Sequence, residues 1–205
     1  FLLDSLRDAG VGTDGIVRTN DAKTALAFVS LDADGERSFS FHRPPAADLL
    51  FRDEHFQATM FEHASALHAC SNSLTEPAIA EATCAGLRRA RVAGALASVD
   101  LNLRQVLWAA DVDPTPWLWR LLDEAVLVKL ARNELDYLAA PLGSEDAVFE
   151  RLFAGHARLV LVTDGPADMH WRTRDSHGTA AGFRVRAIDT TAAGDAFVGG
   201  LLYRL

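Results

Sequence analysis

The segment with the most potential chemistry lies near the end of the chain, where two acids, Asp189 and Asp195, bracket a run of threonines and small residues. An apolar stretch with helical character follows. Small residues let the backbone approach a ligand closely, and the free amides at the start of a helix attract anions. The pattern therefore predicts an anion hole built from the amides of Ala193, Gly194 and Asp195, with Ala192 beside them.

Asp195 stands at the edge of this predicted anion hole, where the same field favours an ionised carboxylate. A carboxylate beside a bound phosphoryl group suits a general base that accepts the proton of an attacking hydroxyl. The alternative is an ordinary capped helix, in which Asp189 or Thr190 is the cap and Asp195 only complements the helix dipole.

The composition limits the class of partner. The chain has 205 residues and a formal net charge of −8, and its hydrophobic and charged fractions of 49% and 23% are those of a globular protein. Net negative charge disfavours a nucleic-acid partner but still allows one loop to hold a small phosphorylated ligand.

No apolar run approaches the roughly 20 residues of a membrane span. Cys70 and Cys84 match no metal or disulfide pattern, so we expect buried, reduced thiols in a cytoplasmic protein.

Short apolar runs alternate with helical segments over most of the chain, which predicts βαβ units and a mostly parallel sheet. The runs cover residues 64–69, 95–99, 125–130 and 159–163; the helical segments cover 76–92, 114–123, 133–139 and 145–153. Parallel sheets bind ligands beyond the carboxyl ends of their strands. The polar residues that follow the runs are therefore candidates, namely Ser71-Asn72-Ser73, Asn102, Arg104, Thr163 and Gly165.

A different pattern precedes these units. Residues 24–31 and 36–43 read as two strands joined by the turn signal Asp34-Gly35, with Phe39 and Phe41 on one face. We therefore divide the chain into an α/β core, residues 1–12 and 45–205, and a β-hairpin region, residues 13–44. Because the chain begins at Phe1 and ends within a helical pattern, we expect it to be a fragment that lacks N- and C-terminal parts.

Residues 189–195 resemble the signature Asp-Thr-x-(Gly/Ala)-Ala-Gly-Asp of the PfkB, or ribokinase-like, family of sugar kinases. Residues 100–104, with Leu107-Trp108 after them, are similar to the Asp-x-Asn-x-Arg…Leu-Trp stretch of bacterial fructokinases, and residues 24–43 resemble their substrate lid. The resemblance covers essentially the whole chain. It implies a three-layer α/β sandwich with a mostly parallel sheet and a small β lid that closes over the sugar.

The resemblance also implies an activity, the ATP-dependent phosphorylation of a primary hydroxyl, with D-fructose converted to fructose 6-phosphate as the leading expectation. Asp195 would be the base and Ala192, Ala193 and Gly194 the anion hole. The remaining roles would be sugar contacts from Arg43, Asn102 and Arg104, and nucleotide contacts from Thr163 and Gly165. The alternative to a sugar contact is a structural role: a surface salt bridge for Arg104 and a charge that protects the edge strand for Arg43.

The resemblance also implies metal positions. Glu134 would act on Mg²⁺ through water, and its alternative role is that of a solvated helix acid. Asp189 and Thr191 would hold a monovalent cation such as K⁺, and their alternative role is an Asx turn.

The sequence departs from the family pattern at three positions. Ala131 replaces the Asn of an Asn-x-x-Glu motif, Asp168 stands where a second Gly is common, and Ala192 would cost about 1–2 kcal/mol if its φ is positive.

Several alternatives stay open from the sequence. The first is another kinase of the family, acting on 2-keto-3-deoxygluconate, ribose or a nucleoside. The second is a non-catalytic sugar or nucleotide sensor with the same fold. A dinucleotide-binding protein ranks low because no Gly-x-Gly-x-x-Gly follows a strand. We also expect a homodimer that forms through the lid, favoured by an exposed face that carries Phe39 and Phe41.

Overall fold

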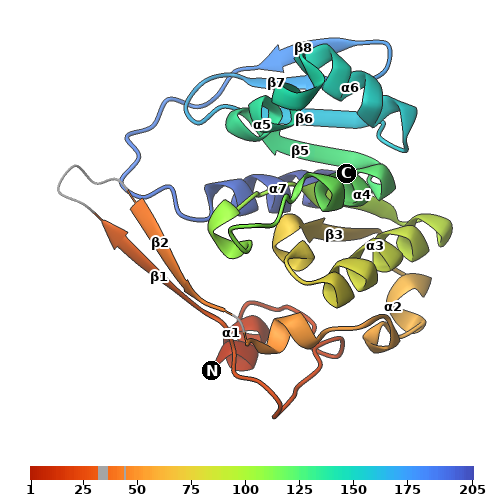
Figure 1. Cartoon of the computed structure of the whole chain (residues 1–205), viewed down its shortest axis with the longest axis vertical. Helices are drawn as coiled ribbons and strands as arrows, with labels where there is room; N and C mark the ends of the chain where they lie inside the picture. Colours follow the sequence, from red (N-terminus) through yellow and green to blue (C-terminus); the bar gives the residue numbers. More distant parts are fainter. Residues whose placement is uncertain (32–36, 44) are drawn as a thin grey trace.

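The computed structural model describes residues 1–31, 37–43 and 45–205, and its centre is a six-stranded sheet in the order β3-β4-β5-β6-β7-β8 (Figure 1). Four strands are parallel: β3 (Ala66–Cys70), β4 (Leu96–Asp100), β5 (Leu127–Ala131) and β6 (Leu159–Thr163). Two antiparallel strands, β7 (Met169–Arg172) and β8 (His177–Ala180), extend the sheet at one edge. The predicted α/β class with a mostly parallel sheet is confirmed.

The four predicted helical segments are helices that connect or follow the parallel strands. They are α3 (Pro77–Val92), α4 (Thr115–Glu124), α5 (Arg132–Leu142) and α6 (Glu145–Ala154). Local signals set their ends: Ser144 caps α6 by accepting the Ala147 amide at 3.1 Å, and Gly143 ends α5 with a φ of +83°. The other helices are α1 (Leu2–Asp8), α2 (Thr59–Glu62) and α7 (Ala193–Arg204).

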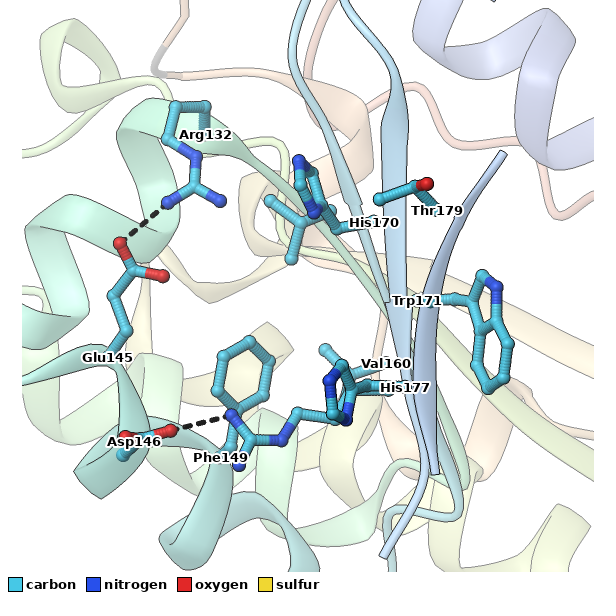
Figure 2. A pocket seen from close by; sticks show the side chains of 12 residues that line it. Arg132, Glu145, Asp146, Phe149, Val160, His170, Trp171, His177 and Thr179 are labelled. Atoms are coloured by element: carbon cyan, nitrogen blue, oxygen red, sulfur yellow. Dashed lines mark hydrogen bonds and ion pairs between the residues drawn. The ribbon is translucent and has the colours of Figure 1, made fainter. Parts of the chain in front are cut away.

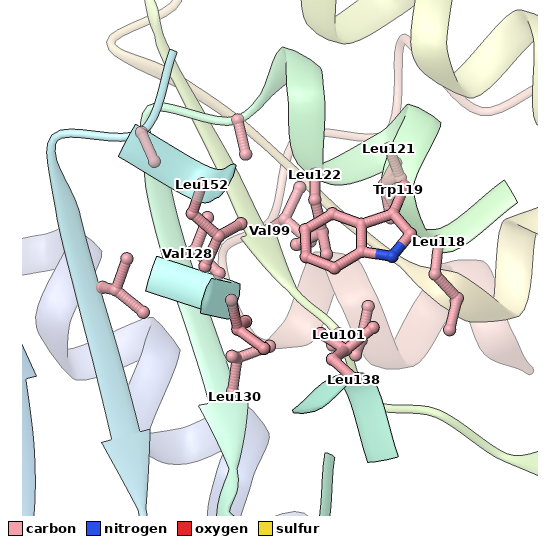
Figure 3. Close-up of a cluster of buried hydrophobic side chains, with 14 of the residues drawn as sticks. Val99, Leu101, Leu118, Trp119, Leu121, Leu122, Val128, Leu130, Leu138 and Leu152 are labelled. Carbon is pink, nitrogen blue, oxygen red and sulfur yellow. The ribbon is translucent and has the colours of Figure 1, made fainter. Parts of the chain in front are cut away.

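The two faces of the sheet differ in polarity because successive strand residues point to opposite sides. One face carries Val99 and Val128, which pack in the main core against leucines of the helices α4–α6 (Figure 3). The other face carries Ser98, Asp100 and Lys129, all of them buried. Helix α7 lies on this second face, because Gly194 in its first turn lies next to Lys129. The apolar face forms the main core, and the polar face lies next to α7.

The predicted hairpin is present as a separate antiparallel sheet of β1 (Leu26–Leu31) and β2 (Arg37–His42). The Asp34-Gly35 turn lies outside the described residues, and the domain division at residues 13 and 44 stays a prediction. The expectation of an exposed Phe39/Phe41 face is wrong. Both rings are half-buried and stack 6.0 Å apart, and the opposite face exposes Leu26 and Phe28, at 53% and 57%.

The strands β7 and β8 were not predicted, because neither forms an apolar run: β7 reads Met-His-Trp-Arg and β8 reads His-Gly-Thr-Ala.

Both cysteines are free; Cys84 is buried, as expected, while Cys70 is only partly buried. Burial raises the pKa of the Cys84 thiol to about 11. Of the helices that the structure describes, none is long and apolar enough to cross a membrane.

Candidate active site

The first turn of α7 contains the three amides that are predicted to bind an anion, and that role stays a prediction. The Ala193 amide already donates to the carbonyl oxygen of Thr190 at 3.2 Å, so it is used within the loop. The amides of Gly194 and Asp195 have no intrahelical acceptor, because they lie in the first turn of a helix. Figure 1 shows this turn on the side of the molecule where β5 ends, the side on which parallel sheets bind ligands.

Ala192 precedes this turn in the left-handed conformation, with φ +60° and ψ 13°. The positive φ that the sequence left open is therefore present, at a cost of about 1–2 kcal/mol for a residue with a Cβ. The Ala192 carbonyl accepts the Ala196 amide at 2.8 Å, so the strained residue also begins the helix. The strain thus lies beside the amides that would bind an anion.

We expect Ala192→Gly to stabilise the fold by about 1 kcal/mol, because glycine adopts a positive φ without the steric penalty. Urea denaturation measures the effect. Ala140→Gly is the matched control: this exposed residue lies within α5, where the same change should cost about 1 kcal/mol. Equal losses in both variants would mean that the Ala192 backbone is unstrained.

Asp195 is exposed in the first turn of α7, where its own amide and that of Gly194 lack an intrahelical acceptor. Its position fits the predicted base, because an exposed carboxylate at this edge can reach a bound hydroxyl. Gly194 lies directly over a buried ion pair: a Cβ on Gly194 would be 3.4 Å from Lys129 Nζ and 3.8 Å from Asp100 Oδ2. Lys129 Nζ donates to both carboxylate oxygens of Asp100 at 3.0 Å.

Lys129 is a residue of this site that was not predicted from the sequence. A usable signal was present, because a lysine inside an otherwise apolar strand must have a partner if the strand is buried. Asp100 ends the neighbouring strand and is the register partner of Lys129. This pairing across two strands depends on their register, which residue spacing alone does not specify.

Glu134 holds the loop that follows β4. Its Oε1 accepts the Leu103 amide at 2.8 Å, and its Oε2 accepts the Ala131 amide at 2.7 Å. The side chain is buried, at 3% exposure, and burial raises the pKa of its carboxyl even though both amides stabilise the charged form. Glu134 is therefore not the solvated helix acid considered as the alternative, and its contact with Mg²⁺ stays a prediction.

The residues Asn102 and Arg104 lie in the loop that Glu134 holds. Asn102 has a positive φ of 43°, and the Arg104 guanidinium lies 6.0 Å from the centre of the Phe39 ring. A cavity of about 350 Å³ opens between this loop, α5 and the hairpin; its lining includes Phe39, Phe41, Arg104, Asn133, Glu134 and Tyr137. The hairpin thus presents its aromatic face to Arg104, one of the three residues predicted to bind sugar.

Arg43 connects the hairpin to the core. Its guanidinium donates to Asp48 Oδ2 at 2.8 Å, to the Asn72 carbonyl at 2.9 Å and to Thr75 Oγ1 at 3.3 Å. The side chain is 8% exposed, so it is not the solvated edge-strand charge of the alternative interpretation. These contacts anchor the base of the hairpin, and a sugar contact by Arg43 stays a prediction.

The nucleotide-side candidates lie at the end of β6. Thr163 ends the strand, with its Oγ1 3.5 Å from the Leu130 carbonyl, and Gly165 follows in a turn with φ +51°. Asp189 and Thr191 are joined by an Asx turn, in which the Thr191 amide donates to Asp189 Oδ1 at 2.7 Å. This turn is the alternative that the sequence left open; cation binding by the same residues stays a prediction.

A separate cavity of about 370 Å³ lies between α6 and the strands β7 and β8 (Figure 2). Its charged residues are already paired, Arg132 with Glu145 and Arg172 with Asp146, each at 2.7 Å. None of the predicted site residues, all of which the structure describes, lines it. The candidate active site is therefore the α7 turn together with the loop that follows β4.

Comparison with known proteins adds independent findings. A family model described as pfkB family carbohydrate kinase matches residues 1–205. A crystal structure of a fructokinase with bound ATP from Xylella fastidiosa is 57% identical, with a TM-score of 0.96, and covers 100% of this chain and 63% of that one. Fructokinase-1 of Zea mays is 40% identical over 98% of this chain and 62% of its own length.

A third relative is the structure of a Vibrio cholerae O395 fructokinase double mutant in fructose, ADP and potassium ion bound form. It is 30% identical, with a TM-score of 0.86, and the match covers 100% of this chain and 65% of that one. The chain therefore spans less than two thirds of the length of each of these three relatives.

Proposed function

Because the chain belongs to the pfkB family of carbohydrate kinases, we propose that it transfers the γ-phosphoryl group of ATP to a primary hydroxyl of D-fructose. The choice of fructose is supported by relatives named as fructokinases, one of them 57% identical. The observation that carries the proposal is the first turn of α7, where the Gly194 and Asp195 amides face the ligand side beside an exposed carboxylate.

In this reaction Asp195 accepts the proton of the sugar hydroxyl as its oxygen forms a bond to the γ-phosphorus. The bond from that phosphorus to the bridging oxygen of ADP breaks, and its electron pair leaves with ADP. The Gly194 and Asp195 amides donate to the oxygens of the transferring group; one such donor is typically worth about 2.7–4 kcal/mol. ATP supplies the phosphoryl group when it is bound, and Thr163 and Gly165 line its side of the site.

We also propose that the hairpin acts as a lid. Its half-buried Phe39 and Phe41 line the cavity that contains Arg104, so closure over a sugar would exclude water and limit hydrolysis of ATP. The outer face of the hairpin, with Leu26 and Phe28 exposed, supports a homodimer formed through the lid. Analytical ultracentrifugation tests this proposal, and a strict monomer at working concentration would exclude the dimer.

We also propose that the site holds Mg²⁺ and a monovalent cation. Mg²⁺ retains several waters and binds mainly to the phosphates, which fits a site where, over the described residues, no three acidic, histidine or cysteine side chains cluster. Glu134 would act on it through water. Asp189 and Thr191 would hold K⁺, and the potassium ion bound form of the Vibrio fructokinase supports this assignment. The two free cysteines are consistent with a reducing cytoplasmic location.

A substrate panel tests the function. ADP release by the complete gene product is measured with fructose, 2-keto-3-deoxygluconate, ribose and a nucleoside. The nucleoside matters because an aminoimidazole riboside kinase from Salmonella enterica is also similar, at 27% identity. We expect the highest kcat/KM with fructose. A higher value for another sugar would transfer the assignment to that substrate, and binding without any turnover would favour the non-catalytic sensor.

A further inference from the structure

A buried ion pair lies under the proposed anion hole. Asp100 is the last residue of β4, Lys129 lies within β5, and the two are register partners on neighbouring strands. Their exposures are only 3% and 7%, and Lys129 Nζ is 3.0 Å from both carboxylate oxygens. Moving two charges out of water costs several kcal/mol per ion, and the attraction within such a pair often only offsets that cost. Stability alone is therefore a weak reason for this pair.

The pair is in direct contact with α7. A Cβ placed on Gly194 would lie 3.4 Å from Lys129 Nζ and 3.8 Å from Asp100 Oδ2, so both charged groups lie within van der Waals reach of this turn. The ammonium is the nearer of the two groups. A positive charge next to the N-terminus of a helix has the same sign as that end of the helix dipole. Asp100 balances the ammonium, so the pair is neutral overall, but the positive end of its dipole is the end nearer to the amides and would attract an anion bound there.

We propose that the Asp100–Lys129 ion pair is a positioning element for phosphoryl transfer: it fixes the position of the α7 first turn over the sheet and turns the positive end of the pair's dipole toward that turn. This inference rests on the proposed kinase function. The pair touches no substrate in this role; it acts through the turn that does. The γ-phosphoryl group, which carries the migrating charge, would be the group most affected.

The test removes both charges while keeping the volume. Asp100→Leu/Lys129→Met replaces each side chain with an apolar one of similar shape, a change that often leaves stability intact when both partners are removed together. Asp100→Asn/Lys129→Gln is the second variant, which keeps a neutral hydrogen-bonding pair. The control is Arg91→Met/Glu124→Met, which removes an ion pair of 3.0 Å between α3 and α4, among the helices of the opposite face, and also removes the Glu124 partner of Arg88, which is 57% exposed.

Five quantities are measured on the complete gene product: the urea midpoint, kcat, KM for fructose, and the affinities for ADP and for a non-hydrolysable ATP analogue. We expect both double variants to fold and to lose about 10–100-fold in kcat, with little change in KM for fructose. This loss of kcat is smaller than the loss expected when an oxyanion donor is removed outright. Affinity for the ATP analogue should fall more than affinity for ADP, which lacks the γ-phosphate. The control should keep the wild-type kcat and the wild-type ratio of the two affinities.

Wild-type kcat and an unchanged affinity ratio in either folded double variant would overturn the inference. Equal losses in the control would overturn it as well, because they would reflect general destabilisation. If the wild-type protein itself releases no sugar-dependent ADP, the proposed function fails. The affinity ratio still reports on the ion pair in that case, so the two failures are distinguishable.

Discussion

Asp195→Asn is expected to lower kcat by about 10²–10⁴-fold, the usual contribution of a positioned general base. Asparagine keeps the size of the side chain and the first turn of α7 but cannot accept the proton of the sugar hydroxyl. Affinities for fructose and for a non-hydrolysable ATP analogue should therefore stay close to those of the wild type. Steady-state ADP release and calorimetric binding on the complete gene product measure the two effects separately.

Asp136→Asn is the control for this exchange. Asp136 lies on α5, and its ion pair with Arg132, at 3.8 Å, is largely exposed on the aspartate side. The same chemical change there should leave kcat unaltered. Unchanged turnover in Asp195→Asn would remove the base from the proposed mechanism. A loss of ATP affinity equal to the loss of kcat would instead identify Asp195 as a binding group.

Glu134→Ala is expected to reduce the free energy of unfolding by about 2–6 kcal/mol. The change leaves two part-buried amides, those of Leu103 and Ala131, without their acceptor, at about 1–3 kcal/mol each. The loop that carries Asn102 and Arg104 should loosen at the same time, so KM for the sugar should rise. Urea denaturation and sugar-dependent kinetics measure these effects.

Glu134→Gln separates the structural role from the proposed metal role. Its amide oxygen still accepts one hydrogen bond, so it should lose less stability than the alanine variant. Glu145→Ala on α6 is the control, because its pair with Arg132 is half-exposed and should contribute less than about 1 kcal/mol. If Glu134→Ala keeps its urea midpoint and only the Mg²⁺ requirement rises, the loop-holding role is wrong.

The parallel part of the fold could be predicted because its signals are local. Each buried parallel strand is a short apolar run, and short motifs encode some of the helix ends, such as those at Ser144 and Gly143. The strands β7 and β8 could not be found this way. They lie at the edge of the sheet, where β7 alternates apolar and polar residues over only four positions. So short a pattern does not separate a strand from a loop.

The site was predictable where one segment contains it and not where several segments meet. The small residues before Asp195 identified the α7 turn, and the helix begins there as expected. The second contact of Glu134 comes from Leu103, 31 residues away in the sequence, and Lys129 meets Asp100 across two strands. Arg43 likewise finds its partners in Asp48, Asn72 and Thr75. Such pairings follow from tertiary packing, which spacing along the chain does not encode.

Because one face of the central sheet is apolar and the other is polar, substitutions on the two faces should damage different properties of the protein. Changes at Val99 or Val128 remove contacts in the main core, so the polypeptide would fail to fold and accumulate in inclusion bodies. Paired changes at Asp100 and Lys129 would give well-expressed protein that is a poor catalyst. A library that varies Asp100 and Lys129 together would therefore be soluble but poor in turnover, whereas a library that varies Val99 and Val128 would mostly be insoluble.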